Sequence, residues 1–160
     1  MLKGANQVMA NKMTSDFINE ASSANTTIDA SVSYDSIVDA IATLNVEDES
    51  GIFVIVNPQG KAELRKDEDY VAARMGEVVY NGQVGTIAGI PVIVSKAVDG
   101  AIVMTKDAVK LFIKKDVEVE QDRDADTRTN SVYLRTAYVC ALVDETKICK
   151  ILTAWLNNLH

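Results

Sequence analysis

The side chains that most often carry covalent catalysis are sparse in this 160-residue chain. A serine, threonine or cysteine nucleophile needs a neighbouring base, most often histidine. The single histidine is the terminal residue, His160, and the two cysteines, Cys140 and Cys149, are too few and too far apart for a zinc site. The sequence therefore predicts no enzyme: no catalytic residue, no structural metal and no cofactor.

The acidic run Asp-Arg-Asp-Ala-Asp at 122–126 has the alternating carboxylates of a calcium loop. An EF-hand loop starting at its first residue requires glycine at the sixth position and glutamate at the twelfth, but Thr127 and Tyr133 stand there. Because charge runs are usually exposed, we interpret the run as a solvated hairpin turn or as a salt-bridged surface between subunits. The residues of this candidate inter-subunit surface are Asp122, Arg123, Asp124 and Asp126.

The glycines at 82, 85 and 89 do not form a nucleotide-binding motif. Both the dinucleotide fingerprint and the phosphate loop need a glycine that opens a helix, whereas Gly89 leads into Ile90-Pro91. We interpret these glycines as turn residues. Carboxylates are abundant, but their scatter in the sequence shows no pairing of the kind that glycosidases use.

The amino-acid composition argues against nucleic acids and membranes as partners. Sixteen basic against 23 acidic residues give a formal net charge of -7, which opposes general binding to nucleic-acid phosphates. The longest apolar runs, 52–56 and 138–143, are far shorter than the roughly 20 residues of a membrane helix. The first residues lack a secretory signal, so we expect a cytoplasmic origin. Apolar residues make up 48% of the chain, as in globular proteins.

The sequence predicts three helices in the first half of the chain. Apolar residues recur every three or four positions over 2–18, which predicts an amphipathic helix whose stripe packs in a core or against a partner. The polar segment 21–33 that follows is expected to be a linker or an ordered surface loop. Ser33 is a suitable cap for a helix over 34–44, and Asn57-Pro58 favours the start of a short helix over 59–66. Residues 66–81 are polar and aperiodic, which indicates a long surface excursion.

The expected strands lie mainly in the second half. The β-branched run 52–56 predicts a central strand, and the proline in 90–94 favours a sheet edge or a strand start. Further strands are expected over 101–104, 109–120, 130–143 and 147–152, with an acidic loop over 122–129. If Asp144-Glu145 is a two-residue hairpin loop, Cys140 lies opposite Cys149, and we expect both thiols to be reduced. Helices followed by strands indicate an α+β fold.

An ordered series of segments resembles the major capsid proteins of tailed phages with the Hong Kong 97-like fold. The helix at 33–41, the strand and proline-started helix in Gly51-Ile52-Phe53-Val54-Ile55-Val56-Asn57-Pro58, and Ala62 to Asp67 resemble the A-domain of that family. Gly85 to Val94 resembles its G-x-I-x-G-[IV]-P-V strand, and 117–124 and 132–151 resemble the strands that return to the P-domain. The likeness covers about residues 33–152.

The resemblance implies a truncated capsid fold: the spine helix and linker of the P-domain at 1–32, the A-domain at 33–108, and the end of the A-domain with the returning P-domain strands and a C-terminal tail at 109–160. The extended N-terminal arm and the E-loop that precede the spine helix in the family are expected to be missing. It also implies a structural subunit that self-assembles into the icosahedral head shell of a double-stranded DNA phage or prophage. Its partners would be copies of itself and scaffolding or other head proteins, with no specific nucleic acid and no membrane.

The implied location is the virion capsid, assembled in the host bacterial cytoplasm. Two alternatives stay open at this point. One is a phage-derived adaptor module that has lost assembly and binds a protein through the first helix. The other is an enzyme, which would require a pocket of converging acids with a bound metal.

Overall fold

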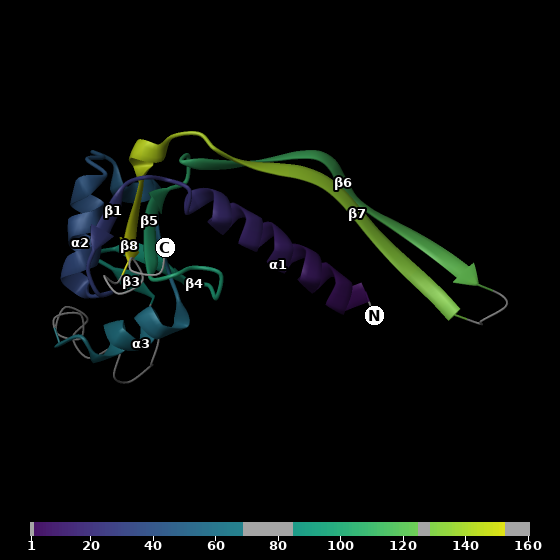
Figure 1. Ribbon diagram of the computed structural model, residues 1–160, viewed down its shortest axis with the longest axis horizontal. Helices are drawn as coiled ribbons and strands as arrows, with labels where there is room; N and C mark the ends of the chain where they lie inside the picture. Colours follow the sequence, from purple (N-terminus) through teal and green to yellow (C-terminus); the bar gives the residue numbers. More distant parts are fainter. Residues whose placement is uncertain (1, 69–84, 125–128, 153–160) are drawn as a thin grey trace.

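A computed structural model describes residues 2–68, 85–124 and 129–152 of the chain (Figure 1). It contains three helices among these residues, α1 (Leu2–Ala21), α2 (Tyr34–Thr43) and α3 (Pro58–Lys66), and two short 3-10 turns, Glu49–Gly51 and Glu145–Lys147. The strands are β1 (Thr27–Asp29), β2 (Ile52–Val56), β3 (Thr86–Ile87), β4 (Ile90–Val94), β5 (Ala101–Thr105), β6 (Val109–Asp124), β7 (Thr129–Leu142) and β8 (Ile148–Leu152).

Six strands form one mixed sheet in the order β1-β8-β5-β2-β4-β3. β2 is an inner strand, antiparallel to β5 and parallel to β4, which confirms the central position predicted from its β-branched run. β8 lies between β5 and β1, antiparallel to the first and parallel to the second. Pro91 is the second residue of β4, so its missing N–H falls near a strand start as expected.

The sheet separates two hydrophobic cores because successive side chains of a strand point to opposite faces. On one face Val54 and Val103 pack with Ile37 of α2 and Leu64 of α3. On the other face the alternate residues of the same strands, among them Ile102, pack against the C-terminal end of α1. The sheet therefore carries α2 and α3 on one side and the end of α1 on the other (Figure 1).

The helix starts follow the sequence signals. The Ser33 hydroxyl accepts a hydrogen bond from the Ser36 N–H at 3.2 Å, and the Ser33 N–H donates to the Ser36 hydroxyl at 2.9 Å, which forms a capping box for α2. Asn57 caps α3 by accepting from the Gly60 N–H, and Pro58 occupies its first turn. Both predicted starts are confirmed.

The predicted hairpin between 130–143 and 147–152 is wrong. A 3-10 turn at Glu145–Lys147 separates β7 from β8, and the two strands join different sheets. Cys140 is paired with Leu111 of β6, and Cys149 with Val103 of β5, so the two cysteines are not cross-strand neighbours. Asp144 accepts from the Thr146 N–H and hydroxyl, which favours the 3-10 turn over a two-residue hairpin loop.

Two further boundaries differ from the prediction. The linker at 21–33 contains β1, which gains its order by pairing with β8 and which local sequence cannot reveal. The acidic loop at 122–129 is shorter than expected, since β6 continues to Asp124 and β7 starts at Thr129. The excursion predicted at 66–81 falls almost wholly outside the described residues.

α1 and the β6–β7 hairpin extend together from the sheet as an elongated arm (Figure 1). The 20 residues of α1 correspond to about 30 Å of helix. β6 and β7 pair with each other and with no strand of the six-stranded sheet. This arrangement leaves long helix and strand surfaces with few intramolecular neighbours.

Candidate functional site

The arm is held together by two hydrogen bonds from β7 to carboxylates of α1. The Tyr138 hydroxyl donates to Asp16 Oδ2 at 2.7 Å, and the Leu142 N–H donates to Glu20 Oε1 at 3.1 Å. The carboxylates are four residues apart on the helix and the donors four residues apart on the strand. Residues four apart lie on the same face of a helix and also on the same face of a strand. The two hydrogen bonds therefore lie along one line of contact between α1 and β7.

Asp16 is also paired with Lys12, whose Nζ lies 2.6 Å from Asp16 Oδ1. Hydrogen bonds from Lys12 and from Tyr138 hold the pKa of the Asp16 carboxyl below its ordinary value. Conversely, the hydrogen bond to Asp16, with burial and the Asp16 charge, raises the pKa of Tyr138 to about 12. The Tyr138–Asp16 bond is therefore formed by a neutral phenol and an ionised carboxylate over a wide pH range.

The pH limits of this bond follow from the two shifts. Because the folded pKa of Asp16 is lowered, its contribution to stability is present above the unfolded value near 4 and is lost as pH falls through the folded pKa. Because the folded pKa of Tyr138 is raised, its contribution is present below the unfolded value near 10 and is lost as pH rises through about 12.

Replacing Asp16 by asparagine should lower the Tyr138 pKa toward that of an ordinary tyrosine, since asparagine removes the negative charge that opposes the phenolate. Spectrophotometric titration of tyrosinate absorbance, with a Tyr138→Phe variant to identify the signal, measures this shift. A Tyr133→Phe variant is the matched control, because Tyr133 is 58% exposed and lies on the other side of the hairpin. A Tyr138 signal that titrates identically in the Asp16→Asn variant and the parent would contradict the assigned bond.

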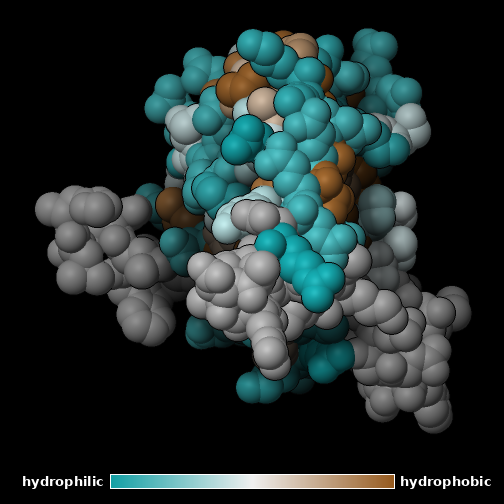
Figure 2. All heavy atoms as spheres, turned by 90° about the vertical axis from the view of Figure 1, so that its right-hand side faces the viewer, coloured by the Kyte–Doolittle hydropathy of each residue, from teal (hydrophilic) through white to brown (hydrophobic). Residues whose placement is uncertain are grey.

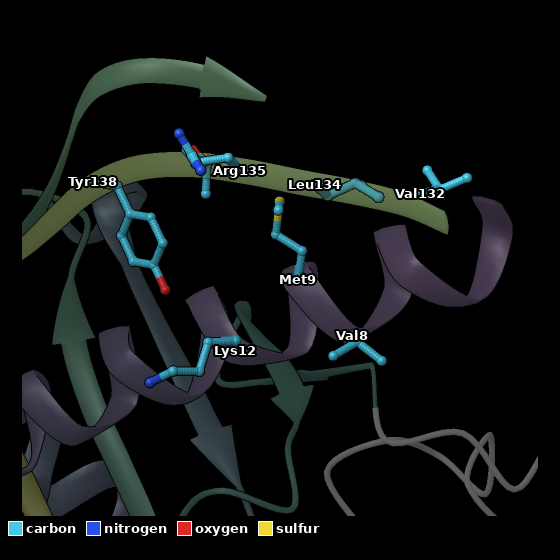
Figure 3. Close-up of a pocket in the computed structure, with 8 residues that line it drawn as sticks. Val8, Met9, Lys12, Val132, Leu134, Arg135 and Tyr138 are labelled. Carbon is cyan, nitrogen blue, oxygen red and sulfur yellow. The ribbon is translucent and has the colours of Figure 1, made fainter. Parts of the chain in front are cut away.

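An open groove runs between the N-terminal part of α1 and β7 (Figure 3). It has a volume of about 590 Å³. Its lining residues are Val8, Met9, Lys12, Val132, Leu134, Arg135, Thr136 and Tyr138. The exposed lining is mostly apolar, and Lys12 and Arg135 are its basic residues, which is the chemistry of a docking surface.

The hairpin also exposes large hydrophobic side chains. Seven of them lie on β6 and β7 within the described residues, each at least 40% exposed: Leu111, Phe112, Ile113, Val117, Val119, Tyr133 and Val139. On the side of the molecule that carries the end of the arm, hydrophobic patches interrupt a mostly hydrophilic surface (Figure 2). Exposed apolar side chains gathered on one hairpin are typical of an interaction surface.

The acidic residues singled out in the sequence lie at the far end of this hairpin. Asp122, Arg123 and Asp124 are the last residues of β6, opposite Ser131, Asn130 and Thr129 of β7. Asp126 lies outside the described residues. Their contact with another subunit stays a prediction.

The cysteines do not form a reactive site. Both are free thiols. Burial, followed by the charges of Asp16 and Glu20, raises the pKa of Cys140, and burial raises the pKa of Cys149. A raised pKa disfavours the nucleophilic thiolate.

Two other kinds of site are absent from the described residues. They contain no group of three or more His, Cys, Asp and Glu side chains placed to hold a metal ion. None of the described helices is long and apolar enough to span a membrane.

Sequence reasoning missed the residues that join the arm. Asp16 and Glu20 have the four-residue spacing of one helix face, which is a usable signal, but nothing in the sequence identifies Tyr138 as their partner. Phe112 and Ile113 lie between lysines in a strand whose sequence predicts that it is half-exposed. Large apolar residues at such positions are the sequence signal for the exposed apolar surface.

Comparison with known proteins identifies a family and a curated relative. The phage capsid protein family matches residues 1–151. The major capsid protein of Staphylococcus phage phiMR11 is 31% identical over 149 residues, which cover 89% of this chain and 54% of the relative. The chain thus spans about half the length of this curated relative.

Solved structures share the fold at low identity. A structure from Mycobacterium phage Che8 matches with a TM-score of 0.80 and 18% identity, covering 94% of this chain and 61% of the other. The capsid structure of the cyanophage P-SCSP1u matches with a TM-score of 0.73 and 12% identity, covering 93% and 63%. The Hong Kong 97-like α+β fold expected from the sequence is confirmed. From the family match over nearly its whole length, the chain belongs to the phage capsid protein family.

Proposed function

We propose that this chain is a shell-forming subunit of a phage or prophage head that works by binding copies of itself. The observation that carries the proposal is the family match over residues 1–151, and the exposed apolar surface of the β6–β7 hairpin supports it. A shell subunit needs contact surfaces on an extended body and no reaction centre. We therefore assign the chain a structural role without catalysis.

Repeated contacts between subunits can be individually weak in such a shell. Once a ring begins to close, each later contact is effectively intramolecular, so modest interfaces suffice for a stable particle. Contacts between different patches of identical subunits close into rings when the rotation between neighbours allows it. An arm that projects from a compact sheet unit is suited to such contacts because it reaches beyond the subunit's own core.

We assign finer roles within this proposal. Residues 33–108 would form the A-domain around the capsomer axis, while 1–32 and 109–160 would form the P-domain that links capsomers, with β1 and β8 joining the sheet of the first unit. The subunit would assemble in the host cytoplasm and reside in the virion capsid. Scaffolding or other head proteins would be its further partners, and no specific nucleic acid would be bound.

Self-association of the purified chain tests the proposal. At micromolar concentration we expect rings or shells by negative-stain electron microscopy and species far heavier than 17.4 kDa by sedimentation velocity. Heterologous contacts that close into rings predict discrete sizes rather than a continuous distribution.

If the chain stays monomeric over the whole concentration range, self-assembly by this chain is rejected. The alternative function, a phage-derived adaptor module that binds a protein partner, is then favoured. The groove between α1 and β7 would then be the surface to test for a protein partner. Monodisperse monomer in both instruments, with a folded circular dichroism spectrum, is the outcome that decides against the proposal.

A further inference from the structure

The residues that follow β8, here called the C-terminal segment, have a composition that favours burial. Residues 153–160 contain no lysine, arginine or carboxylate side chain, although such residues make up 24% of the whole chain. They include Trp155, the single tryptophan of the protein, together with Leu156 and Leu159. Large apolar side chains of this kind are usually covered in a folded protein. The family match ends at residue 151, so the family assigns this segment no role.

One face of β4 lacks a cover among the described residues. Ile90 and Val92 pack in the core that lies under α2 and α3. The core on the α1 side contains residues of β2, β5 and β8 but none of β4. Ile93 pairs with Ile55 of that second core, so both point to the α1 side. There Ile93 is 51% exposed and Pro91, two residues earlier on the same face, is exposed as well.

The C-terminal segment begins at the same end of the sheet as this open face. The ends of β8 and β4 lie in one row across the sheet, through the pairs Ile151–Ala101, Ala101–Val56 and Val56–Val94. Three strand spacings separate them, which is roughly 14 Å. An extended chain starting from Leu152 reaches about 10 Å at Trp155 and about 24 Å at Leu159. The segment is therefore long enough to bring its apolar side chains onto Ile93.

Other exposed apolar side chains are placed less favourably for this segment. Those of the β6–β7 hairpin lie beyond the opposite end of the sheet, because β5 continues from Thr105 toward β6, whereas β8 ends beside Ala101. Val94 is near the start of the segment, but it points to the side that carries α2 and α3. Within the described part of the six-stranded sheet, Ile93 is the most exposed large apolar side chain.

We infer that the C-terminal segment folds back across the α1-side face of the sheet in its own chain and packs Trp155 and Leu156 on Pro91 and Ile93. The contact extends the α1-side core from β2 to β4. The segment is the occupant because it starts at the correct end of the sheet, spans the distance and carries the apolar side chains that the face lacks. Only one copy of the chain is required, so the inference does not depend on the proposed self-assembly.

The single tryptophan makes this contact measurable in the full chain. Indole fluorescence moves to shorter wavelength in an apolar environment. We therefore expect the folded protein to emit at shorter wavelength than the protein unfolded in guanidinium, and to be quenched several-fold less by acrylamide. Ile93→Ser should move the emission most of the way to the unfolded value, because a polar group replaces the apolar contact. The emission should be the same at nanomolar and micromolar protein, since the contact lies within one chain.

Two control variants test where the indole packs. Val94→Ser is the matched control, because Val94 is the next residue of the same strand and points to the opposite face. Val8→Ser tests the groove between α1 and β7 as another place for Trp155. Both variants should keep the emission of the parent, and circular dichroism shows whether each of them is folded.

Alkylation measures the same contact from the side of the sheet. In an Ile93→Cys variant, the further change Trp155→Ala should raise the rate of iodoacetamide labelling at position 93 several-fold, because the indole no longer covers the thiol. Mass spectrometry of the labelled peptides measures this rate. The free thiols Cys140 and Cys149 are internal references, and their labelling should not change because neither lies on β4.

Several outcomes would overturn the inference. These are emission of the folded parent at the unfolded wavelength, no shift in Ile93→Ser, equal shifts in Ile93→Ser and Val94→Ser, and a shift in Val8→Ser alone. Emission that changes with protein concentration would assign the segment to a second copy and also overturn packing within one chain. Shells that form while Trp155 is exposed to solvent leave the proposed function standing and this inference refuted. A monomer whose buried Trp155 depends on Ile93 gives the reverse result.

Discussion

Replacing Gly100 by alanine is expected to destabilise the protein by at least about 4 kcal/mol, an exceptional loss for one methyl group. Gly100 has a φ of +81°, and a Cβ built there would lie 2.2 Å from the backbone oxygen of Ile151. The clash falls between the entry to β5 and the neighbouring strand β8, and it is with backbone, which cannot swing aside. Thermal unfolding should show a loss of roughly 10 °C or more for a chain of this length.

Two other glycines separate the clash from the backbone conformation. Gly89 has a φ of +83° but no atom within 4 Å of a built Cβ, so alanine there should cost only about 1 kcal/mol for the left-handed conformation. Gly51 has neither a positive φ nor a nearby atom, so alanine there should be nearly neutral. Equal losses at Gly100 and Gly89 would show that conformation, and not the approach of β8, determines the effect.

The elements predicted best are those whose signals are local. Ser33 and Asn57 identify the starts of α2 and α3 because a cap needs only the residues next to it. The central position of β2 follows from an uninterrupted β-branched run, which requires burial on both faces.

Features set by distant residues were not predictable in this way. Residues Thr27–Asp29 form a strand because they pair with the edge of β8, which lies more than 120 residues later in the sequence. Cys149 lies beside Val103 because β8 pairs with β5 in the six-stranded sheet, where Ile148, Cys149 and Ile151 are buried. A rule for local turns, applied to Asp144-Glu145, takes no account of the pairing and burial of β8 in the six-stranded sheet.

The candidate surface was anticipated only in part. The sequence marks the acidic end of β6, but the exposed apolar surface of the hairpin depends on the register that pairs Phe112 with Val139 and Glu120 with Tyr133. Two irregularities in β6, between Ile113 and Glu118, set that register.

Replacing Ile18 by alanine should cost about 3 kcal/mol, because Ile18 is 1% exposed and packs in the core on the α1 side of the sheet. Its neighbours there include Ile102, Met104 and Ile148, which belong to β5 and β8. Ile18 therefore fixes the point at which α1 leaves the sheet, and its loss should loosen the helix as well as lower global stability.

Val8 on the same helix is the matched control. It is 69% exposed, so Val8→Ala should change the free energy of unfolding by no more than about 0.5 kcal/mol in a non-assembling preparation. Denaturant titration measures both variants, and hydrogen exchange of the α1 amides reports whether the helix opens before the sheet. If α1 is held by Ile18 and by the Asp16 and Glu20 contacts together, Ile18→Ala should accelerate exchange in α1 while the β2 and β5 amides remain the last to exchange. Unchanged protection of α1 in that variant would mean that the carboxylate contacts with β7 alone position the arm, and the orientation of the hairpin in an assembly would then depend on Tyr138 and Leu142 instead of on the core.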